Sequence, residues 1–179
     1  MKPIVMLMCL AAALAAEQTR NEVTKPTTPA DDSKANSNQV PDVYAVKGNF
    51  ERVLIFRFKF QAELLAGLEQ MVKEHKIKNA VILAGAGSVR NYQIHSVSNR
   101  TFPSKNMYVK DTGAPADIIS MNGYIIDGKI HAHMTMANPE HAFGGHLEPG
   151  TNVFTFAIIT VGVLNDAADL SKADDKTYR

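Results

Sequence analysis

The chain has 179 residues, of which 45% are hydrophobic and 21% are charged, a composition typical of one folded domain. It is too short for two domains of full size. Its 19 basic and 18 acidic side chains give a net charge of +1, which argues against nucleic acid as a partner, because nucleic-acid-binding proteins usually carry a clustered basic face.

The first 16 residues have the layout of a secretory signal peptide. A single basic residue, Lys2, precedes an apolar run from Pro3 to Ala16, and residues 13–15 supply small residues for cleavage. The run is shorter than the roughly 20 apolar residues of a membrane-spanning helix. Cleavage would also remove Cys9, the only cysteine, so the mature chain would have no disulfide bond or thiol nucleophile. We therefore expect a secreted or periplasmic protein without a membrane span.

Polar sequence flanks the expected domain on both sides. Residues 17–43 are rich in Thr, Pro, Asn, Asp and Ser, and this composition predicts a disordered linker. Residues 165–179 predict a polar C-terminal tail with at most one short helical turn. The folded domain is therefore expected at residues 44–164.

The first half of this domain is predicted to hold strands and one helix. Residues 51–60 end in the charged and apolar alternation of a half-buried strand. Apolar residues then recur at helical spacing within residues 61–77 and predict an amphipathic helix. Residues 79–97 predict two strands joined by a glycine turn at Gly85–Gly87. This turn lacks the lysine and the third glycine of a phosphate-binding loop, so nucleotide binding is not expected.

The second half is predicted to consist of strands. Residues 106–112 and 116–126 read as two strands around Gly113–Pro115. Asp127-Gly128 then predicts a tight hairpin that joins residues 118–126 to residues 129–137. Residues 152–164 are too apolar for an edge strand and predict a central one. The expected fold class is α+β, a largely antiparallel mixed sheet packed with one main amphipathic helix.

Residues 129–137 place two histidines on one face of the predicted hairpin. Side chains alternate across a strand, so His131 and His133 project from the face opposite to Ile130, Ala132, Met134 and Met136. Gly144 and Gly145 permit unusual backbone conformations, which would let His146 turn back towards the pair. Three neutral histidines with an open fourth position are typical of zinc or a related divalent metal. A polar cluster without a metal, or a subunit contact, is the alternative.

Other polar residues have weaker predicted roles. Glu148 is the candidate fourth ligand or base, and Arg90 is a candidate for holding an anionic group. His141 is expected to be a loop residue, and Glu140 is a further polar residue near the histidines. His95 has no partner nearby in the sequence and remains unassigned.

Residues 44–164 resemble the plants-and-prokaryotes conserved domain, also called DUF296. The resemblance rests on "GAGSV" at 85–89, "IISMNGYI" at 118–125, "HAH" at 131–133 and "GGHLEPG" at 144–150. It implies an α/β sandwich-like fold, a homotrimer with sheet edges in the subunit contacts, and a metal at His131, His133 and His146.

The same resemblance implies DNA binding. In plant members the domain follows an AT-hook in the chain, and bacterial members are described as DNA-binding by analogy. This chain has no Arg-Gly-Arg-Pro hook, and it reads "PADII" at 115–119, where plant members carry a partner-binding motif. We therefore expect a homotrimer that binds a divalent metal, most plausibly zinc, and a small ligand. The alternatives are a metal-dependent enzyme acting on a small substrate and a DNA-binding protein.

Overall fold

The computed structural model describes residues 20–26, 41–101 and 104–173. The predicted signal peptide lies outside these residues. Within them the chain forms one helix and seven strands: β1 (Arg20–Pro26), β2 (Phe50–Lys59), α1 (Leu64–Glu74), β3 (Ala80–Val97), β4 (Lys105–Ile126), β5 (Lys129–Ala137), β6 (Ala142–Leu147) and β7 (Val153–Leu164).

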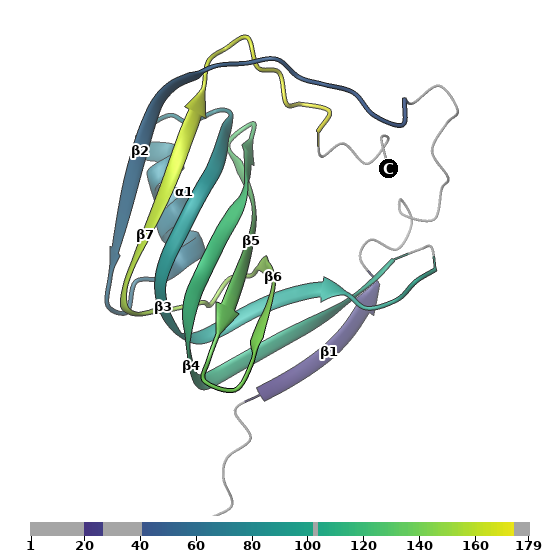
Figure 1. Ribbon diagram of the computed structural model, residues 1–179, viewed down its shortest axis with the longest axis vertical. Coiled ribbons are helices and arrows are strands. Elements are labelled where there is room, and N and C mark those ends of the chain that lie inside the picture. Colours follow the sequence, from purple (N-terminus) through teal and green to yellow (C-terminus); the bar gives the residue numbers. More distant parts are fainter. Residues whose placement is uncertain (1–19, 27–40, 102–103, 174–179) are drawn as a thin grey trace, which may run out of the picture.

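The strands form a single sheet in the order β1-β4-β5-β6-β3-β7-β2 (Figure 1). The pairings between these strands are antiparallel. Since β3 also pairs with β4, the strands β4, β5, β6 and β3 close into a ring. The ring brings β3 and β5, which are far apart in the sequence, to either side of β6.

Two long bent strands replace four predicted shorter ones. The turn predicted at Gly85–Gly87 is wrong, because β3 continues through it, and β4 likewise continues through Gly113–Pro115. The glycines serve close approach: a side chain at Gly85 would collide with Met121, and one at Gly87 with the backbone of Phe156. Figure 1 shows both strands bending: the first half of β3 lies beside β7, and the first part of β4 lies beside β1.

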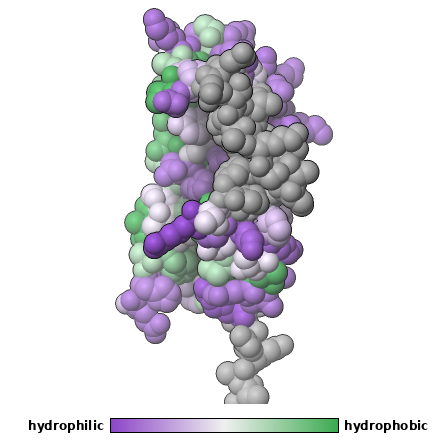
Figure 2. Space-filling model, turned by 90° about the vertical axis from the view of Figure 1, so that its right-hand side faces the viewer, coloured by the Kyte–Doolittle hydropathy of each residue, from purple (hydrophilic) through white to green (hydrophobic). Residues whose placement is uncertain are grey.

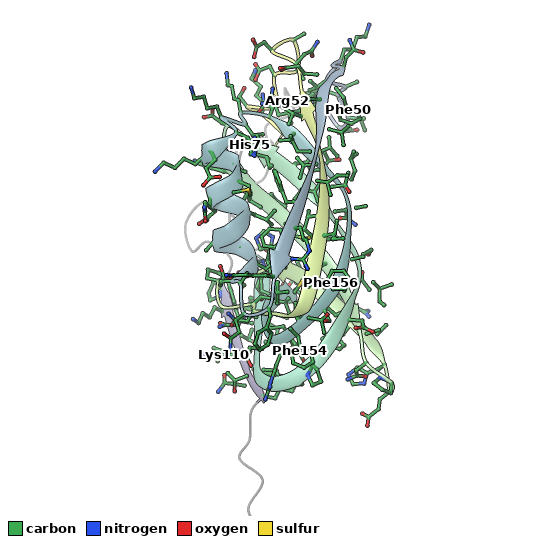
Figure 3. The ribbon with its side chains drawn as sticks, turned by 90° about the vertical axis from the view of Figure 1, so that its left-hand side faces the viewer. Phe50, Arg52, His75, Lys110, Phe154 and Phe156 are labelled. Atoms are coloured by element: carbon green, nitrogen blue, oxygen red, sulfur yellow. The ribbon has the colours of Figure 1, made fainter. Side chains whose placement is uncertain are left out.

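Helix α1 covers one face of the sheet, as Figure 3 shows from the side. It lies inside the predicted range, and both flanks adopt left-handed backbone, with φ of 67° at Gln61 and 51° at Lys76. Leu64, Leu68 and Val72 are buried against the sheet, which confirms the amphipathic pattern. No helix in the described parts of the chain is long and apolar enough to cross a membrane.

The predicted hairpin and the predicted central strand are both confirmed. Asp127 and Gly128 have φ of 48° and 75°, the left-handed values of a type I′ turn, and they join β4 to β5. Strand β7 lies between β3 and β2.

The described parts of the two flanking segments contact the domain, which their composition does not predict. Strand β1 falls inside the predicted linker and pairs with β4, although all of its residues are exposed. Backbone pairing holds this strand together with two side-chain contacts: the guanidinium of Arg20 donates to the hydroxyl of Tyr92 at 3.2 Å, and Nζ of Lys25 stands 5.4 Å from the ring centre of Tyr108. None of these contacts requires a hydrophobic pattern in the sequence. In the predicted tail, Ala168 and Leu170 are 2% and 8% exposed, because that segment packs back onto the domain.

Candidate metal centre

His131 and His133 project side by side from β5. Their neighbours Ala132 and Met134 are 1% and 2% exposed and lie in the core, so the predicted assignment of faces is confirmed. The Nε2 atoms of His131 and His133 are 3.3 Å apart. The two rings stack with their centroids 5.3 Å apart. The hairpin thus presents two imidazole nitrogens to the same point in space.

His146 completes this cluster from the neighbouring strand. It pairs with His133 across β5 and β6, and its ring stands edge-on to the other two, at centroid distances of 4.8 Å from His131 and 5.1 Å from His133. One ligand nitrogen from each of the three residues lies within 4.8 Å of the others. The structure therefore brings the three predicted histidines together.

Gly144 and Gly145 position His146 for a different reason from the one predicted. They do not turn the chain back, because they lie within β6 itself. A side chain at Gly144 would collide with the carbonyl of Met134, and one at Gly145 with the carbonyl of His95. The two glycines allow β6 to fit closely between β5 and β3, and this pairing puts His146 in register.

The spacing of His131 and His133 fits a shared divalent ion. A tetrahedral zinc with ligands at about 2.0–2.1 Å holds neighbouring nitrogen ligands about 3.3–3.4 Å apart. The Nε2 separation of 3.3 Å matches that value.

The pKa of His133 favours the neutral imidazole that a metal needs. Burial lowers this pKa from its ordinary value of 6.5, and the nearby charges of His131 and His95 lower it further. Because only the neutral ring can donate a lone pair, this shift keeps His133 competent as a ligand at neutral pH.

A second cluster lies on the other side of His146. The ring of His95 stacks on that of His146 at a centroid distance of 4.6 Å, and its Nδ1 lies 2.5 Å from Oε1 of Glu148. His95, His146 and Glu148 also place one ligand atom each within 4.8 Å of the others. Glu148, a predicted fourth ligand or base, therefore contacts His95.

The sequence alone gives His95 no role in the site. It reaches the cluster because it pairs with His146 across β3 and β6. That pairing joins segments about 50 residues apart, and no local spacing reveals it. In the sequence, its only signal is a histidine within a predicted strand whose partner strands are unknown.

The remaining candidates lie elsewhere. The guanidinium of Arg90 stands 5.8 Å from the ring of Phe154 and lines a different cavity from the one beside His131 and His133. His141 and Glu140 are exposed, and their backbone amides donate to the side chain of Asn138 in the loop before β6. His141 is thus a loop residue, as predicted.

Comparison with known proteins identifies the family. The model of the Plants and Prokaryotes Conserved (PCC) domain matches residues 45–165. No curated protein gives a significant match.

Solved structures show the same fold. A metal-containing protein from Archaeoglobus fulgidus aligns with a TM-score of 0.59 and 18% identity, covering 71% of this chain and 88% of that one. A plant- and prokaryote-conserved protein from Pyrococcus horikoshii aligns with 0.56 and 26%, covering 69% and 85%. A hypothetical protein from Salmonella enterica aligns with 0.56 and 23%, covering 68% and 81%. The expected fold class is confirmed, and the chain belongs to the PCC domain family.

Proposed function

We propose that this protein binds a divalent metal ion, with zinc the best candidate, through His131, His133 and His146. The observation that carries the proposal is the 3.3 Å separation between the Nε2 atoms of His131 and His133. Imidazole nitrogens suit zinc and several other divalent transition metals. When bound, such an ion would supply a positive charge and an open coordination position.

The family adds support of a general kind. The relative from Archaeoglobus fulgidus is described as metal-containing. At 18% identity the likeness establishes the fold alone, so the argument for metal binding rests on the geometry of this chain's own histidines.

Metal content measured on protein without a histidine tag tests the proposal. We expect about one zinc per chain after loading and desalting, and near zero for His133→Ala. His141→Ala is the matched control, because this histidine lies outside the cluster and is expected to leave the metal content unchanged. Equal metal content in wild type and His133→Ala would contradict the proposal.

We further propose that the protein is exported and assembles as a homotrimer. Residues 1–16 support export through their signal-peptide pattern. Assembly is supported by large apolar side chains that stay exposed on neighbouring strands: Val53, Ile55, Leu83, Ile119, Phe156 and Ile158. Figure 2 shows hydrophobic side chains gathered along one edge of the view. Apolar patches on a sheet commonly mark protein contacts.

The mass of the native particle tests the assembly. Light scattering is expected to give three times the chain mass, and Ile55→Asp is expected to lower it, because a carboxylate would be buried in the contact. A monomeric wild type would contradict the homotrimer.

A further inference from the structure

A cavity of about 510 Å³ opens beside the metal centre, with His131 and His133 in its wall. The rest of the wall comes from two sources. Strand β4 supplies Tyr124 and Ile126, while the segments before β2 and after β7 supply Tyr44, Val46, Leu170 and Ala173. The cavity therefore exists because both flanking segments cross this side of the sheet (Figure 1).

Hydrogen bonds hold these crossing segments in place. The backbone amide of Asn165 donates to the carbonyl of Asn49 at 2.9 Å, and the amide of Asn49 donates to the side chain of Asn165 at 3.3 Å. Asn79, which is buried, donates to the carbonyl of Ala168 at 2.8 Å and accepts from the amide of Asp127 at 3.1 Å. The outer wall is thus tied to the hairpin turn that leads into the histidines.

The wall is apolar apart from its histidines, Asn122 and the hydroxyl groups of Tyr44 and Tyr124. Tyr44, Val46 and Tyr124 are 43%, 39% and 50% exposed, so each offers apolar surface to this cavity. Leu170, which is buried, adds a further apolar side chain to the wall. Small-molecule sites are typically of about 300–1,000 Å³, mostly apolar, with a few polar groups at one point.

Charge favours an anionic group at the histidine end. Three neutral histidines leave the charge of a divalent ion uncompensated, and the described residues around this cavity include no carboxylate. Glu148, on the other side of His146, is bound to His95. In the adjoining cavity of about 230 Å³, Lys129 and Asp127 both contribute to the wall, so their charges offset.

From these features we propose that the metal-loaded site binds a small amphiphilic acid. The acid group faces His131 and His133, and an apolar or aromatic body lies between Tyr44 and Val46 on one side and Tyr124 on the other. This inference rests on the proposed metal site, because the ion supplies the positive charge that selects the acid.

Calorimetry with two carboxylates tests the inference. Acetate probes the acid group alone, and 4-phenylbutyrate adds an apolar body. On zinc-loaded protein we expect 4-phenylbutyrate to bind at least about tenfold more tightly than acetate, because its phenylpropyl group leaves water. Tyr124→Ser is expected to remove most of this advantage while leaving the zinc content and acetate binding unchanged. Val97→Ser is the matched control, since Val97 is also an exposed apolar strand residue but lies outside both the cavity wall and the proposed subunit contact.

The results separate the two proposals. If zinc is retained but 4-phenylbutyrate binds no more tightly than acetate, the ligand inference is wrong and the metal site stands. If 4-phenylbutyrate binds equally well to His133→Ala without zinc, the role given to the ion is wrong. If the wild type retains no zinc, both proposals fail.

Discussion

Two pairs of side chains flank His146, and their spacings differ in an informative way. The Nε2 atoms of His131 and His133 are 3.3 Å apart, a distance at the long end of hydrogen bonds that also equals the separation of two ligands on one ion. Nδ1 of His95 and Oε1 of Glu148 are 2.5 Å apart, a short hydrogen-bond distance. We infer that the first pair is arranged to share an ion, and that the second pair holds the ring of His95 against His146.

The largest expected effect comes from the residue that both clusters share. His146→Ala removes a proposed ligand, so zinc affinity is expected to fall by more than about 100-fold, beyond the cost of losing an outer-shell partner. Competition with a chelator measures the affinity, and the unfolding midpoint of the metal-free variant checks that the fold is intact. Unchanged affinity would remove His146 from the site.

A smaller effect is expected from the second pair. Glu148→Gln keeps the shape of the side chain but removes its charge, so His95 would be held less firmly against His146. Zinc affinity is expected to fall by about threefold to tenfold, at or below the usual range for outer-shell partners. Glu140→Gln in the exposed loop is the control. A loss as large as that of His146→Ala would instead place the ion between His95, His146 and Glu148.

The smallest expected effect concerns pH and the metal-free protein. The folded-state pKa of His133 lies below 6.5, so the unfolded chain binds the proton more readily. The contribution of neutral His133 to the free energy of unfolding is therefore fully present above pH 6.5, and it is lost as the pH falls below that value. Because the side chain is exposed to screening solvent, the change should stay below about 1 kcal/mol.

Urea unfolding at pH 7.5 and pH 5.5 measures this contribution. His133→Asn is expected to show less loss of stability at the lower pH than the wild type. A wild type that becomes more stable at pH 5.5 relative to this variant would contradict the direction of the pKa shift.

Local patterns predicted the half of the site that lies on one hairpin. Asp127-Gly128 and the alternation of residues 129–136 are contained in the sequence itself, and they correctly put His131 and His133 on one face. The same alternation put Met134 in the core.

The features of the site that the sequence does not predict depend on pairing between strands that are far apart in the sequence. His95 joins the cluster only through the register of β3 against β6, and β1 depends on its pairing with β4 and on the contacts of Arg20 and Lys25 with distant tyrosines. The sequence indicates that the glycines of β6 matter for the position of His146. It does not show that they allow close contact between neighbouring strands, because it does not place those strands side by side.

X-ray absorption spectroscopy of the zinc-loaded protein tests the central claim most directly, because it counts the ligands around the ion. We predict three imidazole nitrogens at about 2.0–2.1 Å in the wild type, and two in any zinc that His146→Ala retains. A coordination shell with fewer than three imidazoles, or one unaffected by the loss of His146, would contradict the proposed site.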